Sequence, residues 1–391
     1  MKVARLAYGL LLFVWIALAH SNASAQTYEV MQERNGLINA FARLKAGQPL
    51  RVLFLGGATS SDVVSTDAAN TWPAKTVSWL KRQYPRAVIS VTGVNCSGSG
   101  AYGAAMLWPI VSACQPDLVF VDLADQDGEA VSQHSGEWVN SATEGLIRQI
   151  RTSNAAAEMC FIYGLRKEML PAYKQGLLPG CIFQHDVAAA HYRICSVNAG
   201  ASAAEQINTG KLTWAEFAGD AGSLTAAAHA LYADTLTAFL AEQALHVGRG
   251  VIPYRMVSRL SAAAISSVRV QLPEGALSQG WSRVAEAPVA GATSVTLHAA
   301  AGAAAIKISF EGTFASPVIV TGKGLQSIEV KIDEGAWVRI VVPASGAAST
   351  GLWSATAGTG LKLGAHSLEI RPVGTSSLIL AGVATAGVSE P

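Results

Sequence analysis

The sequence has little that points to a metal, a nucleic acid or a membrane-spanning domain. It contains no Cys-x-x-Cys spacing, which disfavours a structural zinc site. Lysine plus arginine (28) nearly balances aspartate plus glutamate (27), so the basic excess typical of nucleic-acid binding or of an anionic membrane surface is missing. After the first 25 residues, no charge-free apolar stretch reaches the ~20 residues that a transmembrane helix needs. We therefore expect no metal, no cofactor and no nucleic-acid partner.

Cysteine is also scarce, and it is confined to the first half of the chain. The odd number of cysteines would leave at least one unpaired even in an oxidising compartment. The pattern does not specify which residues would pair. The five are Cys96, Cys114, Cys160, Cys181 and Cys195.

The N-terminal segment has the pattern of a cleaved signal peptide. Lys2 and Arg5 precede a short apolar run over residues 6–19, and Ala23-Ser24-Ala25 fits a small-x-small cleavage site. The run is too short for a comfortable membrane anchor. We expect residues 1–25 to be removed and the mature protein to be periplasmic or secreted, with no transmembrane segment after cleavage.

Residues 26–248 predict an α/β domain. Strand-like and helix-like segments alternate, which is typical of a mostly parallel, flavodoxin-like sheet with helices on both faces. The segment 116–124 is nearly continuous in apolar residues, as expected of a strand covered on both sides. The predicted strands are 51–56, 87–95, 116–124 and 158–165, and the predicted helices are 71–85, 141–154 and 224–245.

Residues 256–391 have a different composition and predict an all-β domain. Short alternating runs are separated by turn residues, a pattern that favours a jelly-roll or sandwich. The predicted strands are 293–299, 304–312, 316–322, 327–333, 337–343, 366–373 and 376–384.

Three polar, glycine-containing stretches follow strands of the first domain: "GGATSSD", "NCSGSGAYG" and "DLADQDGE". In a parallel sheet, ligands bind at the carboxyl ends of the strands. These stretches therefore mark the expected site.

The first domain resembles the SGNH (GDSL-type) hydrolase superfamily, and most closely a subfamily whose first block reads Gly-Gly-Ser-x-Thr. The resemblance covers about residues 50–245 and implies an ester hydrolase or acyltransferase fold, often one that acts on O-acetylated polysaccharides. The stretches that carry it are "FLGGATSS", "NCSGSGAYGA", "PDLVFVDLADQDGE", "EGLIRQIR" and "DAGSLTAAAHALYAD".

The family's nucleophile and base positions are both altered. The serine position of the first block is Ala58, which has no hydroxyl. The last block retains Asp220, but Ser223 stands where the family has its histidine base. Because nucleophile and base act jointly, loss of both would abolish acyl transfer. The resemblance thus predicts a catalytically degenerate protein.

The oxyanion positions are partly kept. The family's backbone donor corresponds to Gly98 or Gly100, and its asparagine corresponds to Gln126, whose amide lies one methylene further out. A displacement of about an ångström in a tight site costs roughly 10²-fold in rate. Gly57 and Ser60 would line the same cleft.

Neighbouring residues offer weak alternatives for the lost groups. Ser60 and Ser61 follow the empty position, but serine at this place is more typical of a helix N-cap. His229 matches a second family histidine with a packing role, and His185 and His191 flank a helix-like segment expected near the surface. His134 follows the third block with no specific role.

Two further groups of residues were weighed as binding sites. The acidic run Asp122, Asp125, Asp127 and Glu129 fits a solvated, helix-capping loop better than a metal site or a contact to a cationic sugar. An oxygen-rich metal site needs about 6–8 ligands in a set geometry. The second domain resembles carbohydrate-binding modules that accompany some of these hydrolases. Its candidate sugar-stacking residues are Trp281, Trp337 and Trp353, at least one of which we expect in the core.

Three functional hypotheses follow. The leading one is an exported pseudoenzyme that binds an acylated polysaccharide or a peptidoglycan-type glycan. The alternatives are an active carbohydrate O-acyl esterase or acyltransferase with a rearranged site, and a structural envelope protein with a protein partner.

Overall fold

A computed structural model describes most of the chain. The described residues are 28–57, 60, 68–96, 100–128, 136–219, 223–246, 250–261, 265–286, 295–321, 327–342, 351–354, 356–374 and 377–387. The proposed signal peptide lies outside them. In this part of the chain, no helix is both long and apolar enough to cross a membrane.

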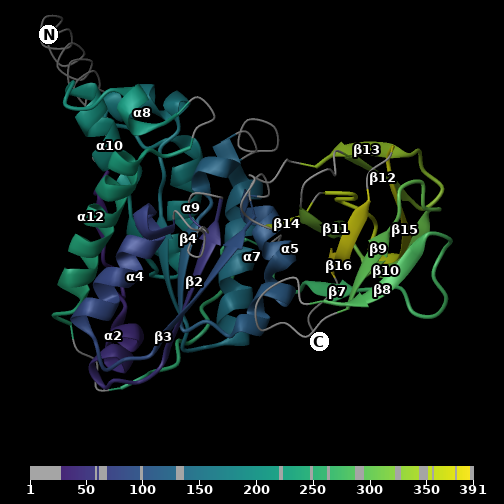
Figure 1. The fold of residues 1–391 in the computed structure, drawn as a ribbon, viewed down its shortest axis with the longest axis horizontal. Coiled ribbons are helices and arrows are strands. Elements are labelled where there is room, and N and C mark those ends of the chain that lie inside the picture. Colours follow the sequence, from purple (N-terminus) through teal and green to yellow (C-terminus); the bar gives the residue numbers. More distant parts are fainter. Residues whose placement is uncertain are drawn as a thin grey trace, which may run out of the picture.

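The first domain is a six-stranded sheet between two layers of helices (Figure 1). The strand order is β1-β6-β5-β4-β2-β3, and all neighbours are parallel except β1, which pairs antiparallel with β6. The predicted parallel α/β sheet is thus confirmed. The strands are β1 (Met31–Gln32), β2 (Leu50–Gly56), β3 (Ile89–Asn95), β4 (Leu118–Asp122), β5 (Glu158–Ile162) and β6 (Cys195–Val197).

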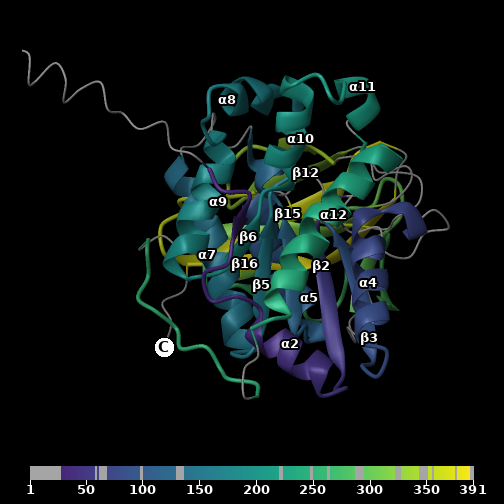
Figure 2. The ribbon, with the colours of Figure 1, turned by 90° about the vertical axis from the view of Figure 1, so that its left-hand side faces the viewer.

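Helices cover both faces of this sheet. The face turned to the viewer in Figure 2 carries α2 (Ile38–Lys45), α4 (Trp72–Gln83), α10 (Ala199–Asn208) and α12 (Ala226–Gln243). The opposite face carries α5 (Gly100–Val111), α7 (Gly136–Ser153) and α9 (Gly180–His191). Shorter elements are α8 (Leu170–Lys174), α11 (Trp214–Phe217), η1 (Ala68–Asn70), η2 (Ser112–Cys114), η3 (Ala124–Asp127) and η4 (Lys167–Met169).

Local sequence explains where the two helices beside the expected site begin. The Thr71 side chain accepts the backbone N–H of Ala74, and Pro73 occupies the first turn of α4. Thr225 caps α12 in the same way by accepting the N–H of Ala228. Both helices therefore start at the carboxyl edge of the sheet.

Helix α5 differs from the sequence prediction, which has a polar, glycine-rich loop over residues 95–103. The structure places a buried helix from Gly100 onward, with almost every side chain inside the protein. A helix that is apolar all round has no amphipathic stripe, so it gives no periodic signal.

The second domain consists of two antiparallel sheets, as the strand pattern predicted. One has the order β10-β15-β12-β13 and the other β14-β11-β16-β9-β8, with β7 also paired to β16. The finer jelly-roll topology stays a prediction. The strands are β7 (Arg269–Gln271), β8 (Trp281–Ala285), β9 (Val295–Ala299), β10 (Ile306–Gly312), β11 (Phe314–Thr321), β12 (Ser327–Ile332), β13 (Val338–Val341), β14 (Gly351–Ser354), β15 (Gly364–Pro372) and β16 (Leu378–Ala386).

The sandwich packs against α5 of the first domain (Figure 1). Tyr102 on α5 shares a hydrogen bond of 2.7 Å with Ser316 on β11, and its ring stacks on Trp138 with centroids 5.1 Å apart. The buried residues Val318 and Leu352 belong to the hydrophobic core of the first domain. The two domains therefore share a continuous apolar core.

The chain between the domains lies as an extended strap over the first domain. Residues 250–261 contain neither helix nor strand. Asn39 exchanges two hydrogen bonds with the backbone of Ile252, and Glu144 accepts the N–H groups of Leu260 and Ser261 at 2.6 and 2.7 Å. The strap is thus held by side chains of α2 and α7.

Candidate functional site

The candidate site lies where β2, β3 and β4 end. Gly56 is in register with Asn95 on one side and with Asp122 on the other, so the three strand ends form one edge. A Cβ at Gly56 would lie 2.6 Å from the Asp122 carbonyl oxygen and 2.8 Å from the Ser60 Cβ. Only glycine allows this approach, which brings the first and third motifs together.

Ser60 and Asp122 form a buried pair in this edge. The Ser60 hydroxyl donates to Oδ2 of Asp122, and the two residues are 2% and 6% exposed. The backbone N–H of Ser60 donates to the Gly57 carbonyl at 3.1 Å, which fixes Ser60 near the end of β2. The Ser60 side chain is therefore committed to Asp122 in place of the expected helix-capping contact.

The environment of Asp122 favours its protonated form. Burial raises the pKa of Asp122 to about 8, and the neighbouring Asp125 adds to the rise, while the Ser60 hydrogen bond opposes it. Burial also raises the pKa of Asp125 to about 6, and this rise is opposed by Arg166. At neutral pH the Asp122 carboxyl group is thus mostly neutral.

The second oxygen of Asp122 lies close to Gly164 and is buried. Oδ1 is buried and has no hydrogen-bond partner in the described part of the chain. A Cβ at Gly164 would lie 3.5 Å from this oxygen and 3.8 Å from the Tyr232 hydroxyl, which accepts the Leu165 N–H at 2.8 Å. Gly164 therefore packs against the end of β4, next to the Asp122 carboxyl group and the Tyr232 hydroxyl.

Asp127 organises the other side of the edge. Its Oδ2 accepts the backbone N–H of Ala101 at 3.0 Å and lies 2.7 Å from Nε2 of His185. Gly100 has a φ of +53°, and a Cβ there would lie 2.0 Å from Oδ1 of Asp127. His185 is only 1% exposed, so the expectation of a surface location is wrong for this residue.

Gln126, the predicted oxyanion donor, is half-buried on η3. Its side-chain Nε2 lies 3.5 Å from the backbone oxygen of Asp122 and donates to it. The amide is therefore turned toward the end of β4.

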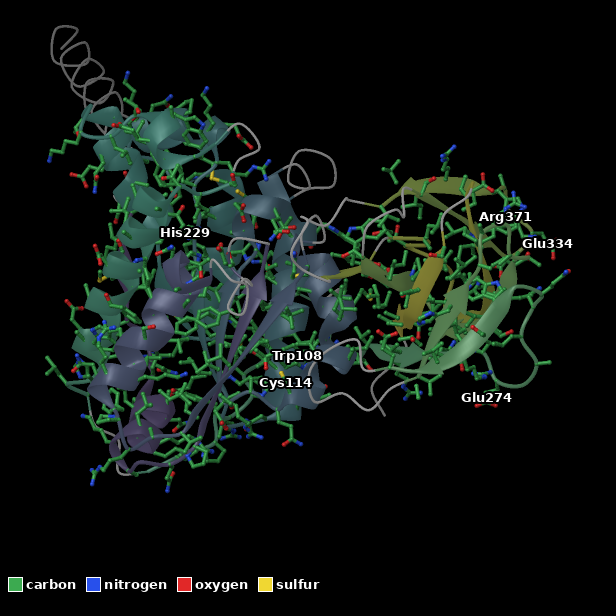
Figure 3. The ribbon with its side chains drawn as sticks, viewed as in Figure 1. Trp108, Cys114, His229, Glu274, Glu334 and Arg371 are labelled. Atoms are coloured by element: carbon green, nitrogen blue, oxygen red, sulfur yellow. The ribbon has the colours of Figure 1, made fainter. Side chains whose placement is uncertain are left out.

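The helix that follows the last motif, α12, lies against the start of α4, which follows the first motif. His229 on α12, labelled in Figure 3, accepts the backbone N–H of Trp72 through Nδ1 at 3.2 Å. Ser223 is exposed, and its carbonyl accepts the N–H of Gly219 at 2.9 Å shortly before α12 begins. The start of α12 and the start of α4 thus lie side by side at the site.

Several predicted site residues lie outside the described residues: Ala58, Ser61, Gly98, Glu129, His134 and Asp220. Their roles stay predictions. Within the described ranges, no three His, Cys, Asp or Glu side chains are arranged to hold a metal ion.

The tryptophans of the second domain have different environments. Trp281 is 8% exposed, and its indole N–H donates to the Ala304 carbonyl at 2.7 Å. The structure gives Trp281 a core position instead of the exposed ring face that sugar stacking requires, and Trp353 is also buried. Trp337 is half-exposed, with the Arg371 guanidinium carbon 4.1 Å from its ring centroid.

Sequence spacing could not reveal the pairs that organise this edge. Ser60 and Asp122 are 62 positions apart, and Asp127 and His185 are 58 positions apart. Each pair depends on the sheet register and on the packing of α9. The acidic run was the one available signal, and it was interpreted as a solvated loop, whereas Asp122 and Asp127 are buried.

No model of a known protein family matches the chain, and no curated protein matches its sequence. The comparison of folds is more informative. The parallel-rich sheet of the first domain and the separate antiparallel sheets of the second resemble, as a whole, the fold of a two-domain esterase.

Two of the solved structures that resemble the whole chain are those of a two-domain esterase (CEX) active on acetylated mannans, one of them co-crystallised with mannopentaose. Each is 19% identical, covers 89% of this chain and 94% of that chain, and superposes with a TM-score of 0.67. A protein described as a GDSL-like lipase from Parabacteroides merdae is 14% identical over 49% of this chain and 95% of its own, with a TM-score of 0.41. At sequence identities this low, the similarity to these structures is a similarity of fold.

Proposed function

We propose that the protein is an exported, catalytically inactive SGNH-type protein that binds an acylated glycan at the carboxyl edge of the first sheet. The observation that carries this proposal is the Ser60–Asp122 pair. Ser60 is the described hydroxyl nearest in sequence to Ala58, yet it is buried and donates to a carboxyl group that favours its neutral form. Such a hydroxyl is a poor replacement for the missing nucleophile.

The histidines near the site support the same view. His229 uses Nδ1 to accept a backbone N–H, and His185 is buried against Asp127. A nucleophile needs a base within about 2.6–3.2 Å, and the Ser60 hydroxyl donates to a carboxyl group and not to either of these rings.

The glycan is proposed from the fold and from the polar groups of the site. The similar two-domain esterase acts on acetylated mannans and was co-crystallised with a mannose oligomer. The half-buried side chain of Gln126, beside the end of β4, would supply hydrogen-bonding groups to a ligand. We therefore propose an acetylated mannan or a related acylated polysaccharide as the ligand class.

The test is a binding measurement with esterase activity assayed in parallel. We expect calorimetry to detect binding of acetylated mannan oligosaccharides, and weaker binding of the same oligosaccharides after chemical deacetylation. Gln126→Ala should weaken binding, whereas Glu274→Gln, an exposed change on the second domain (Figure 3), should not. Equal affinity for both oligosaccharides, or none for either, would contradict the proposal.

A second candidate is an ester hydrolase that uses Ser60 with Asp122 as its base. A carboxylate whose pKa is about 8 is a stronger base than an ordinary one. This candidate requires turnover of acetylated mannan that rises as the pH increases to about 8, levels off above that pH, and is lost in Ser60→Ala. Turnover no higher than that of a heat-inactivated sample would exclude it.

A further inference from the structure

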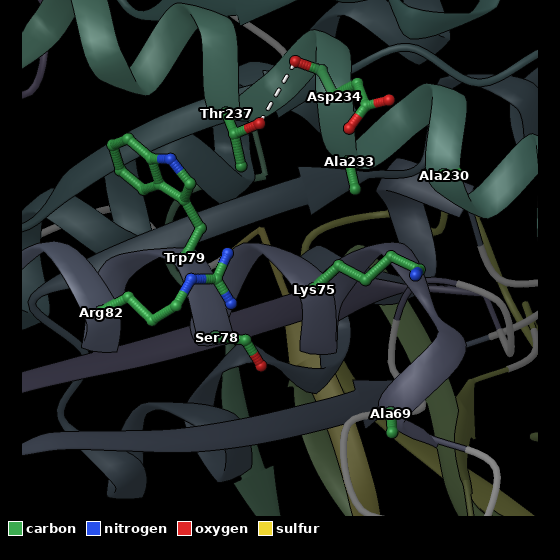
Figure 4. Close-up of a pocket in the computed structure, with 9 residues that line it drawn as sticks. All are labelled: Ala69, Lys75, Ser78, Trp79, Arg82, Ala230, Ala233, Asp234 and Thr237. Carbon is green, nitrogen blue, oxygen red and sulfur yellow. Dashed lines mark hydrogen bonds between the residues drawn. The ribbon is translucent and has the colours of Figure 1, made fainter.

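A groove lies between α4 and α12, on the face of the first sheet that these two helices cover (Figure 4). Its volume is about 390 Å³, within the range of roughly 300–1,000 Å³ that is usual for ligand sites. One wall is made by side chains of α4 and the other by side chains of α12. None of the residues discussed at the carboxyl edge lines it, so the groove is separate from the proposed glycan cleft.

The α4 wall is basic. Lys75 and Arg82 line the groove two turns apart, and neither has an ion-pair partner in the described part of the chain. The opposite wall has one carboxylate, Asp234, which is exposed and has no ion-pair partner among the described residues either. Two cations face one anion, so the groove has a local excess of one positive charge.

The rest of the groove suits a sugar ring. Trp79 lies between the two cations on α4 and is half-exposed, so part of its indole can contact a ligand. On α12, Ala230 and Ala233 have small side chains that leave room for a ligand. Ser78 and Thr237 contribute hydroxyl groups to the groove. An indole face packs on the C–H face of a ring, and the hydroxyls and Asp234 can bond ring hydroxyls.

We propose that this groove binds a carboxylate-bearing pyranose, such as a hexuronate unit of an acidic glycan. The ring would pack on Trp79, and its carboxylate would bind the forked guanidinium of Arg82, with Lys75 as a second cation. A neutral sugar would leave both cations without a partner. This proposal does not depend on the acylated-glycan cleft.

The experiment compares oligosaccharides of equal length in saturation-transfer NMR and calorimetry. Oligogalacturonate should bind the full-length protein at least ten times more tightly than a neutral mannose oligomer. The double variant Lys75→Gln/Arg82→Gln should bind oligogalacturonate at least ten times more weakly. In Trp79→Ala, the saturation-transfer signals from the ring protons of the sugar should disappear. Affinity should fall in 0.3 M salt, as expected of partly exposed charges.

Lys81→Gln is the matched control. Lys81 is an exposed cation on the same helix that does not line the groove, so its removal should leave the affinity unchanged. Thermal unfolding of each variant shows whether the fold is intact. Equal affinity for the neutral oligomer, equal affinity for poly-glutamate, or an equal loss in Lys81→Gln would overturn the proposal. Loss of acetylated-mannan binding by a cleft variant would leave the groove's affinity unchanged, so the two proposals fail separately.

Discussion

At the scale of single residues, Asp122 combines burial with an incomplete set of hydrogen bonds. One carboxyl oxygen is paired with Ser60, and the other is buried without a partner in the described structure. A carboxylate in this position would be costly, which is why its pKa is raised. Asp122, the last residue of β4, should therefore make the stability of the folded protein depend on pH.

We expect the protein to be more stable at pH 5 than at pH 8. The folded-state pKa of Asp122 is about 8, above the ~3.9 of an unfolded aspartate, so the folded state binds more protons between these values. The free energy of unfolding should therefore fall as the pH rises from about 4 to 8. Urea denaturation at several pH values measures this slope.

Asp122→Asn should flatten the slope, because the amide does not titrate. Asp234→Asn is the control, since Asp234 is exposed and far from the strand edge in sequence. A slope as steep in Asp122→Asn as in the unchanged protein would show that other buried carboxyl groups, such as Glu158, carry the effect.

The family's missing groups give a second residue-scale prediction. Ala58→Ser together with Ser223→His should restore a nucleophile and a base, and Gln126→Asn should add an oxyanion donor, a contribution typically worth ~10²–10³ in rate. We expect weak acetyl-ester hydrolysis in the triple variant and none in the single variants, because nucleophile and base contribute jointly. Acetate release from acetylated mannan measures it. A folded but inactive triple variant would mean that the cleft has been reshaped.

At the scale of elements, the strap over residues 250–261 depends on one buried carboxylate of α7. Glu144 is fully buried and accepts the Tyr192 hydroxyl as well as the N–H groups of Leu260 and Ser261. The position of the strap is therefore set by a side chain more than a hundred residues away.

Glu144→Gln should loosen the strap. Replacing one carboxylate oxygen by an NH₂ group leaves a buried N–H facing a donor, at a cost of about 1–3 kcal/mol. We expect a loss of this order in the free energy of unfolding, together with faster trypsin cleavage after Arg255 and Arg259. Glu274→Gln, at an exposed site, should change neither quantity.

Helices and strands could be predicted from the sequence where apolar residues recur at a regular spacing or form a continuous run. The apolar run that became β4 and the capped helices α4 and α12 were all anticipated. Helix α5 was missed because it is apolar on every side, and β1 was missed because two residues carry no pattern. At the site, the sequence identified the motifs, but the pairing of Ser60 with Asp122 and the burial of His185 depend on tertiary contacts.

At the scale of the whole molecule, the two domains are joined by a shared core. Leu352 on β14 is 3% exposed and packs with the core of the first domain, although it belongs to the second. Trp138 of α7 contacts both Tyr102 and Phe314, which places aromatic rings across the junction. The domains should therefore unfold together.

Leu352→Asp should destabilise the entire chain. A charge without a partner in this apolar junction is costly, and we expect a loss of at least about 3 kcal/mol. Val338→Asp is the control, because Val338 is 57% exposed on β13 of the same domain. Thermal unfolding followed by circular dichroism should show one transition that shifts strongly only in Leu352→Asp. Two separate transitions in the unchanged protein would contradict the shared core.

The junction at α5 also bears on how such a gene can change by recombination. A domain that is exchanged between genes must be able to fold with a polar surface of its own. Here β14 and β11 contribute Leu352 and Val318 to a core that belongs mostly to the other domain. A fragment that ended at the strap would carry an unfilled apolar face on α5, and a transferred sandwich would carry the complementary one. The two halves are consequently expected to be inherited as a single unit, with their sequences changing in concert along this seam.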